Sequence, residues 1–224
     1  MKMDFKILSQ CPLFHGMYHT DLEQTLQFLN GKTNTYSKGN SIFLEGSSAG
    51  LVGIVLSGKV QIVREDYYGN RSVLTVLKIG ELFGEVFPCA GLKTMPVSAI
   101  ALQTSDVLLL DCRKIFTSHS DSFGFHNQLI TNLLQEIARK NLDLNKKIRY
   151  MSQKTTKEKV ITYLLDEAKQ NNCSEFTIPY DRQALADYLG VERSTMSAEI
   201  GKLKKKGVID TKGSWFSIQN IEKA

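Results

Sequence analysis

The stretch YDRQALADYLGVERSTMSAEIGKLKKKGV, Tyr180–Val208, decides how the rest of the chain is interpreted. Its apolar residues recur at helical spacing in two short runs, which predicts two helices joined by a tight turn. Asp181 is suited to cap the first helix, and Gly190 tolerates the positive φ that such a turn needs. The residues expected to face inward are Leu185, Ala186, Leu189, Met196, Ile200 and Leu203.

The second helix, beginning near residues 192–194, carries hydroxyls and an arginine at its start and lysines at its end. This pattern fits the major groove of DNA, while a helical hairpin with a solvated, lysine-rich face is the alternative. The next segment, Val208–Ile218, predicts a strand, a turn and a second strand, which is typical of the wing of winged-helix DNA-binding domains. The residues expected to contact DNA are Arg193, Ser194, Thr195, Ser197, Lys202 and Lys212.

Length and composition are those of a globular protein with room for two domains. The chain has 224 residues, 42% of them hydrophobic and 23% charged, with a net charge of +5. No apolar run approaches the roughly 18 residues that span a bilayer, and the first ten residues lack a signal-peptide pattern. The sequence therefore predicts a cytoplasmic protein with no membrane partner.

The four cysteines, Cys11, Cys89, Cys112 and Cys173, are far apart in sequence and form no CxxC pair. Because structural metal and iron–sulfur sites normally use close pairs, no metal ligand set is expected. Free buried thiols are the simplest interpretation. Cys11 is a candidate redox thiol because it lies near the N-terminus.

Residues 3–30 are expected to be helical and irregular, and residues 33–111 to form short strands. The predicted strands are Thr35–Tyr36, Ser41–Leu44, Val52–Leu56, Val60–Val63, Ser72–Leu77, Ser98–Leu102 and Val107–Leu110. Many short strands separated by glycines indicate an all-β sandwich or barrel. Between them, Gly80–Ala99 is too long for a tight hairpin, and Phe83–Val86 could begin a short helix whose free N–H groups would bind an anion.

A long helix is expected from about Phe123 to Met151. Its apolar residues alternate at spacings of three and four, as in a coiled-coil seam, with the polar Asn141 at one seam position. A helix that packs only on its own domain is the alternative. The predicted seam consists of Ile130, Leu133, Ile137, Asn141, Leu144 and Ile148, followed by Met151. A further amphipathic helix at residues 154–170 and a short strand at 176–178 lead to the opening stretch.

The order of SKGNSIFLEGSSAG, IVLSGKVQI and the Gly80–Ala99 cassette resembles the cyclic-nucleotide-binding β-roll. With the helix pair and wing downstream, the chain resembles the Crp/Fnr family of transcription regulators from about Leu8 onward. The resemblance implies an α+β fold: an N-terminal double-stranded β-helix or jelly-roll sensor domain (1–120), a long dimerisation helix (121–151) and a C-terminal winged helix-turn-helix (152–224).

The chain departs from the family pattern at the effector pocket. Gly84 and Glu85 match the Gly-Glu pair with which cyclic-AMP-binding members hold a ribose hydroxyl. The family's Arg-Ser/Thr-Ala triplet is Val97–Ser98–Ala99 here, so the arginine that neutralises the cyclic phosphate is missing, and Lys93 is a poor substitute for it. The expected pocket residues are Gly84, Glu85, Lys93, Val97 and Ser98. Cyclic AMP is therefore not the expected effector; a different small anion, a hydrophobic acid or a silent pocket remain open.

The resemblance also bears on DNA reading and cofactors. Arg193 matches a family arginine that binds guanine, and Ser197 matches a serine of Fnr-like members. Ala198 replaces a base-reading arginine, so the half-site is expected to differ from the standard one. Lys202, Lys204, Lys205 and Lys212 are expected to bind phosphate. No iron–sulfur cluster is expected, because Cys11 stands alone near the N-terminus, and no haem is expected, because the sequence declares no axial ligand set. The small-molecule effector stays unidentified.

Together these features predict a bacterial, homodimeric transcription regulator that binds a palindromic operator under the control of an unidentified small effector. RNA polymerase is a further candidate partner. A thiol-based redox regulator and a ligand-sensing module that acts through protein contacts are the alternatives. No catalytic arrangement is found, so the chain is not expected to be an enzyme. The sequence does not decide between activation and repression.

Overall fold

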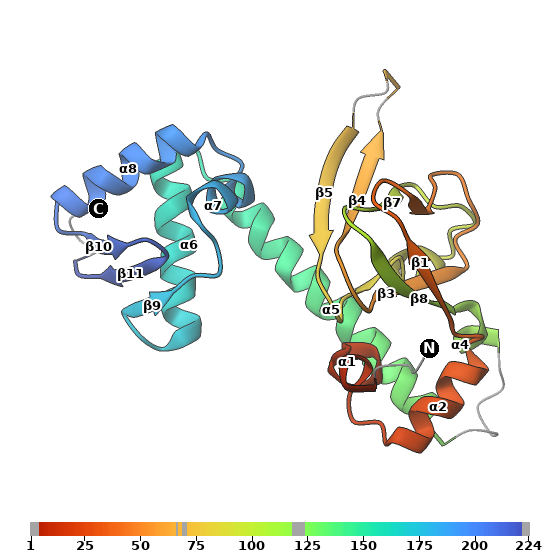
Figure 1. Cartoon of the computed structure of the whole chain (residues 1–224). Helices are drawn as coiled ribbons and strands as arrows, with labels where there is room; N and C mark the ends of the chain where they lie inside the picture. The colour runs from red at the N-terminus through yellow and green to blue at the C-terminus, as the bar shows by residue number, and fades with distance from the viewer. Residues whose placement is uncertain (1–4, 66, 69–70, 118–123, 221–224) are drawn as a thin grey trace. The chain divides into compact units, whose positions relative to one another are not determined.

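The structure is a computed structural model that describes residues 5–65, 67–68, 71–117 and 124–220 (Figure 1). By its internal contacts the chain divides into two units, Met1–Ala138 and Arg139–Ala224. The long helix α5 (His126–Met151) contributes its first half to one unit and its second half to the other. The three-part division expected from the sequence, with boundaries after residues 120 and 151, stays a prediction.

Two antiparallel, four-stranded sheets form the centre of the first unit. One has the strand order β1 (Lys32–Tyr36), β8 (Ser105–Asp111), β3 (Leu51–Val55), β6 (Leu82–Phe83). The other has the order β2 (Ser41–Phe43), β7 (Ser98–Ala101), β4 (Val60–Glu65), β5 (Arg71–Leu77). Every strand expected from the sequence is present, and only β6 is not predicted, because two residues cannot show an alternating pattern.

Strand β8 has both faces buried and so serves two hydrophobic cores. Because successive side chains of a strand point to opposite faces, Val107 and Leu109 enter one core while Leu108 and Leu110 enter the other. The first, here called the roll core, consists of Phe43, Ala49, Val55, Val60, Leu77, Phe83, Met95, Ala99, Val107 and Leu109. The second, the helix-side core, consists of Leu8, Cys11, Leu13, Phe14, Leu22, Leu26, Leu29, Val52, Ile54, Leu56, Leu82, Leu108, Leu110, Cys112, Ile115, Leu129 and Leu133.

Helices close the helix-side core, and those of residues 5–28 confirm the helical N-terminal segment expected from the sequence. They are α1 (Phe5–Gln10), the 3-10 helix η1 (Pro12–Phe14), α2 (His19–Phe28), α4 (Arg113–Thr117) and the first half of α5. The buried amide of Asn132 on α5 donates hydrogen bonds to the carbonyls of Leu13 (3.0 Å) and His15 (2.8 Å). These bonds satisfy a polar group that would otherwise be costly to bury, and they fix α5 against η1.

The long helix is confirmed, but one predicted seam residue is wrong. Leu133 is 3% exposed and belongs to the helix-side core, so it cannot pair with a second helix. Its neighbour Leu134 is 66% exposed instead. Replacing Leu133 by Leu134 gives a regular alternation of four and three residues along a largely exposed stripe, in which Ile137 is half-buried against the helix-side core. This stripe, here called the α5 seam, consists of Ile130, Leu134, Ile137, Asn141, Leu144, Ile148 and Met151.

Besides the second half of α5, the second unit contains the helices α6, α7 and α8 and a three-stranded sheet of order β10–β11–β9. Its elements are α6 (Thr156–Asn171), β9 (Glu175–Thr177), α7 (Arg182–Leu189), α8 (Arg193–Lys205), β10 (Ile209–Lys212) and β11 (Trp215–Ile218). Helix α6 begins with a capping box, in which Thr155 and Glu158 exchange side-chain and backbone hydrogen bonds. It ends at Asn172, whose φ of 48° is left-handed. The predicted helices and wing are confirmed.

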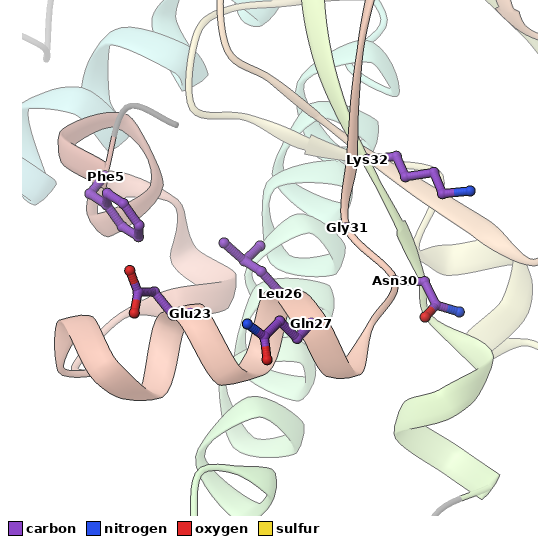
Figure 2. A pocket seen from close by; sticks show the side chains of 7 residues that line it. All are labelled: Phe5, Glu23, Leu26, Gln27, Asn30, Gly31 and Lys32. Carbon is purple, nitrogen blue, oxygen red and sulfur yellow. The ribbon is translucent and has the colours of Figure 1, made fainter. Parts of the chain in front are cut away.

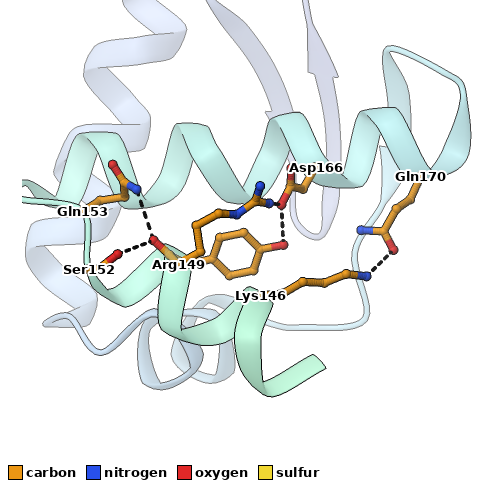
Figure 3. Close-up of polar contacts among 7 residues, drawn as sticks. Lys146, Arg149, Ser152, Gln153, Asp166 and Gln170 are labelled. Carbon is orange, nitrogen blue, oxygen red and sulfur yellow. Dashed lines mark hydrogen bonds and ion pairs between the residues drawn. The ribbon is translucent and has the colours of Figure 1, made fainter. Parts of the chain in front are cut away.

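The last turns of α5 are held to α6 by polar contacts within the second unit (Figure 3). Tyr150 donates a 2.8 Å hydrogen bond to the carboxylate of Asp166, and Arg149 forms an ion pair with the same carboxylate. Lys146 reaches Gln170 one turn further along α6, at 3.3 Å. The C-terminal end of α5 is therefore a fixed part of this unit. Among the described helices, none has both the length and the hydropathy needed to cross a membrane.

Candidate nucleic-acid interface and effector pocket

Helices α7 and α8 form the predicted helix-turn-helix. The Asp181 carboxylate accepts a 2.8 Å hydrogen bond from the Ala184 N–H and so caps α7. Gly190, with φ of 62°, ends α7, and the N–H of Val191 returns to the Ala186 carbonyl at 3.0 Å. This combination is a Schellman-type helix end, and it sets the direction in which α8 leaves the turn.

Helix α8 separates a buried face from an exposed one. Met196, Ile200 and Leu203 are at most 4% exposed and pack in the core of the second unit. The residues expected to contact DNA are all exposed: Arg193, Ser194, Thr195, Ser197 and Lys202 on α8, and Lys212 at the end of β10. The structure thus brings the predicted residues to one helix and its neighbouring wing.

Two lysines of α8, Lys202 and Lys204, form ion pairs with carboxylates of the same unit. Lys204 Nζ lies 2.6 Å from Asp210 Oδ1 and donates to the Thr211 carbonyl at 3.1 Å, so it ties α8 to β10. The hydrogen bond from Lys204 holds the pKa of Asp210 below its usual range. Lys202 forms an ion pair with Glu199, at 2.6 Å. The phosphate role expected for Lys204 stays a prediction, and in this structure its ammonium group contacts Asp210 and Thr211.

Two hollows of about 310 Å³ border α8 on different sides. One is lined by Asp181, Arg182, Gln183, Arg193, Gly213 and Ser214, so it joins the start of α7, the start of α8 and the turn of the wing. The other is lined by Thr155, Thr156, Lys157, Thr195 and Glu199, at the start of α6. Both hollows present helix N-termini beside cationic side chains, which is an arrangement suited to phosphate groups.

Arg182 is a candidate site residue that the sequence does not single out. Its guanidinium carbon lies 4.7 Å from the centre of the Phe216 ring, and Nη2 donates to Thr211 Oγ1 at 2.8 Å. Its Nη1 is buried with no hydrogen-bond partner among the described residues, and burial lowers the pKa of this guanidinium. In the sequence, Arg182 is marked by its place directly after the helix cap Asp181. That Arg182 shares a hollow with Arg193 is known from the fold alone.

The expected effector residues lie in the loops of the first unit. Gly84 has φ of 84°, and a Cβ there would lie 3.2 Å from the Phe43 ring. Glu85 is 1% exposed and directly precedes the short helix α3 (Val86–Cys89), which confirms the helix expected from Phe83–Val86. The cassette therefore places one carboxylate inside the β-roll.

The other three pocket residues are not all brought to the same place. Val97 is 9% exposed, and Ser98 Oγ accepts a 2.9 Å hydrogen bond from the Glu45 N–H. Lys93 is exposed, and its backbone carbonyl accepts from the Ala49 N–H at 3.0 Å. The structure therefore puts an apolar side chain, and not a cation, at the buried triplet position.

A larger hollow, of about 740 Å³, lies among α1, α2 and the start of β1 (Figure 2). Figure 2 shows the side chains of Asn30 and Lys32 on the side away from Phe5 and Glu23. The polar groups of this hollow therefore do not converge on one point, whereas those of a specific ligand site do. The sequence gives no sign of this hollow, because its lining comes from separate elements.

Cysteine placement corrects the sequence interpretation. Cys11, the expected redox candidate, is fully buried, whereas Cys173 is exposed and Cys89 is half-buried. Within the described part of the chain, no group of three or more His, Cys, Asp or Glu side chains is arranged to hold a metal ion.

Two family models match the chain in the order of the two units. A cyclic nucleotide-binding domain matches residues 33–117, and a Crp-like helix-turn-helix domain matches residues 158–223. The cyclic AMP receptor protein of Thermus thermophilus is 26% identical over 205 residues, which cover 88% of each chain. The transcriptional activator protein FnrA of Stutzerimonas stutzeri is 25% identical over 183 residues, which cover 79% of this chain and 72% of FnrA.

Solved structures show the same architecture. The c-di-GMP-responsive global regulator CLP of Xanthomonas campestris aligns with a TM-score of 0.58 at 18% identity, over 91% of this chain and all of CLP. This likeness confirms the fold: an antiparallel β-roll, a long helix and a C-terminal helix-turn-helix with a wing. On its two matched domains and its similarity to these regulators, the chain belongs to the Crp/Fnr family of DNA-binding transcription regulators.

Proposed function

We propose that the protein acts as a homodimer that binds a palindromic operator through α8. In this proposal the β-roll binds a small effector other than cyclic AMP, and the effector shifts the equilibrium between two arrangements of the dimer. Only a ligand that binds one arrangement better than the other can produce such a shift. We assign residues 1–120 to the sensor domain, residues 121–151 to the dimerisation helix and residues 152–224 to the DNA-binding domain.

The α5 seam supports the dimer. Leu134, Leu144 and Ile148 are each more than half exposed, which is unusual for large aliphatic side chains on one helix. Their spacing of three and four residues is that of a two-stranded coiled coil. Asn141 at one seam position would set the register of the pair at some cost in stability. Two copies of α5 packed along this stripe would bury the exposed side chains.

The exposed face of α8 supports DNA binding. The strongest support is the position of the exposed Arg193 in the first turn of α8. Arg193 stands at the start of α8 and lines a hollow with Arg182 and the wing turn. An arginine in this position can reach a guanine edge while the hollow receives the adjacent phosphate. Ser194, Thr195 and Ser197 are short enough to hydrogen-bond to bases or phosphates beside it. Lys202 and Lys212 are assigned to phosphate.

A pair of variants tests this assignment. Arg193→Ala with Lys202→Ala should weaken operator binding at least tenfold in a fluorescence anisotropy titration of the full-length protein, because one bidentate base contact alone contributes about 1–3 kcal/mol. Lys169→Ala is the matched control, since this lysine is exposed in the last turn of α6, whose first turn borders α8. Equal affinity of the double variant and the control would overturn the DNA-reading role of α8.

The β-roll supports an effector other than cyclic AMP. Val97 is buried where cyclic-AMP-binding relatives carry an arginine, and a buried phosphate without a cation costs several kcal/mol. We therefore do not assign to this chain the ligand that the name of the Thermus thermophilus cyclic AMP receptor protein gives. Isothermal titration calorimetry with cyclic AMP should give no heat of binding, while Val97→Arg should restore measurable affinity. Micromolar binding by the unmodified chain would refute the assignment.

A further inference from the structure

The side chain of Thr211, on strand β10, joins the wing to the first helix of the helix-turn-helix. Thr211 Oγ1 accepts a 2.8 Å hydrogen bond from Arg182 Nη2 at the start of α7, and it donates a 2.8 Å hydrogen bond to the Trp215 carbonyl on β11. The guanidinium carbon of Arg182 also lies 4.7 Å from the centre of the Phe216 ring on the same strand. One side chain of α7 therefore holds both strands of the wing.

Further contacts hold the wing on both sides of its turn. Before the turn, the Thr211 carbonyl accepts a 3.1 Å hydrogen bond from Lys204 Nζ of α8, which also pairs with Asp210 at 2.6 Å. After the turn, Ser214 Oγ donates a 2.9 Å hydrogen bond to the Tyr180 carbonyl, which lies just before α7. Because these contacts come from both helices of the pair, the turn between them has a fixed place beside α8.

We propose that Arg182 and Thr211 are positioning residues for DNA binding, which hold the wing so that Lys212 meets a DNA phosphate. This inference rests on the proposed DNA reading by α8. Lys212 directly follows Thr211 and is exposed at the end of β10. A wing that is ordered before binding loses less conformational entropy when the DNA arrives, so the contact of Lys212 contributes more to affinity.

The role needs an arginine at position 182. A guanidinium is flat, so it can stack on the Phe216 ring and still donate a hydrogen bond in its own plane to Thr211. A lysine in its place would keep the charge but would lose this combination. Arg182 also lines a hollow with Arg193, so direct binding of phosphate by Arg182 is the competing role. Direct binding depends mainly on charge, and Arg182→Lys would preserve much of it.

Fluorescence of the full-length protein without DNA tests the order of the wing. Trp215 is the only tryptophan of the chain and is half-buried on β11, so its quenching by acrylamide reports on the wing. Thr211→Val and Arg182→Lys should each raise the quenching constant, whereas Thr211→Ser, which keeps the hydroxyl, should retain the value of the parent protein. Unchanged quenching in Thr211→Val and Arg182→Lys would overturn the proposal.

A double-mutant cycle on DNA tests the effect on Lys212. Anisotropy titrations at several salt concentrations give the slope of log Kd against log salt concentration. In the parent protein Lys212→Ala should reduce this slope by about one, as expected for the loss of one phosphate contact. In the Thr211→Val background Lys212→Ala should have no effect, because the wing no longer presents the lysine. A full effect of Lys212→Ala in that background would overturn the proposal.

Two further comparisons keep the test decisive. Arg182→Lys should bind the operator as weakly as Thr211→Val; binding equal to that of the parent protein would instead assign Arg182 to phosphate and contradict the positioning role. If the parent protein binds no DNA, the proposed function fails, and the quenching of Trp215 still decides whether Arg182 and Thr211 order the wing. Circular dichroism checks that each variant is folded, and Arg182→Lys replaces Thr211→Val in both measurements if the latter fails to fold.

Discussion

The hydroxyl of Tyr150 donates a 2.8 Å hydrogen bond to the carboxylate of Asp166, and it joins the last turn of α5 to α6. Arg149, the preceding residue, forms an ion pair with the same carboxylate (Figure 3). Tyr150 is 1% exposed and contacts the ring of Tyr163 at a centroid distance of 5.6 Å. The end of the proposed dimer helix is therefore part of the core of the DNA-binding unit.

Tyr150→Phe should lower the free energy of unfolding by about 1 kcal/mol, because it removes one hydrogen bond but keeps the ring contacts. Asp166→Ala should cost more, since it leaves the buried Tyr150 hydroxyl and the Arg149 guanidinium without their shared acceptor. Urea denaturation followed by circular dichroism measures both. A Tyr150→Phe variant as stable as the parent would show that this hydrogen bond is not a fixed part of the unit.

Two glycines of the second unit should respond to alanine in opposite directions. Gly201 lies inside α8 with nothing within 4 Å of the place of a Cβ, so Gly201→Ala should stabilise the protein by about 0.5–1 kcal/mol. Gly190 has φ of 62°, and a Cβ there would lie 3.0 Å from Met151 Cε, so Gly190→Ala should destabilise it by about 1 kcal/mol or more. Shifts of the urea midpoint in the same direction for both variants, relative to the parent protein, would contradict the turn geometry.

Leu133 and Leu134 should have different effects, although they are neighbours in sequence. Leu133→Ala should cost about 2–5 kcal/mol of stability, because Leu133 fills the helix-side core. Leu134→Ser together with Ile148→Ser should leave the monomer folded but weaken self-association. Light scattering at several concentrations measures the second effect. A dimer that forms equally well without Leu134 and Ile148 would rule out the α5 seam as its interface.

The contact between Lys204 and Asp210 should make the wing sensitive to acid. Lys204 lowers the pKa of Asp210, so the contact stabilises the fold above the unfolded-state pKa of about 3.9, and the stabilisation is lost as pH falls through the lower folded value. Carbon-detected NMR titration should show the Asp210 carboxyl changing below pH 3.9, and Lys204→Met should move this change upward. An unaltered titration in that variant would exclude the contact as the cause.

Patterns among residues close in sequence are sufficient to predict most of the helices, strands and turns of the fold. The cap at Asp181, the turn at Gly190 and the inward residues of α8 follow from helical periodicity and turn chemistry, which depend on neighbours in sequence. The predicted seam is wrong at one position, where residues 133 and 134 are both leucine. Periodicity accepts either residue, and only burial against η1 and the β-roll distinguishes them.

The sites were less predictable than the elements. Arg182 and Arg193 line one hollow together with the turn of the wing, and no sequence spacing indicates this pair. The place of Cys11 near the N-terminus suggests a redox thiol, but Cys11 is fully buried in the helix-side core. Long-range contacts of this kind depend on the whole tertiary fold.

Selection of bound sequences from a random DNA pool by the full-length protein tests whether a dimer reads DNA through α8. We expect enrichment of a twofold-symmetric site whose half-site centres lie about one helical turn apart, and loss of base preference within each half-site in Arg193→Ala. Enrichment of an unsymmetrical site, or a symmetric site read equally well by Arg193→Ala, would contradict a dimer that reads DNA through α8.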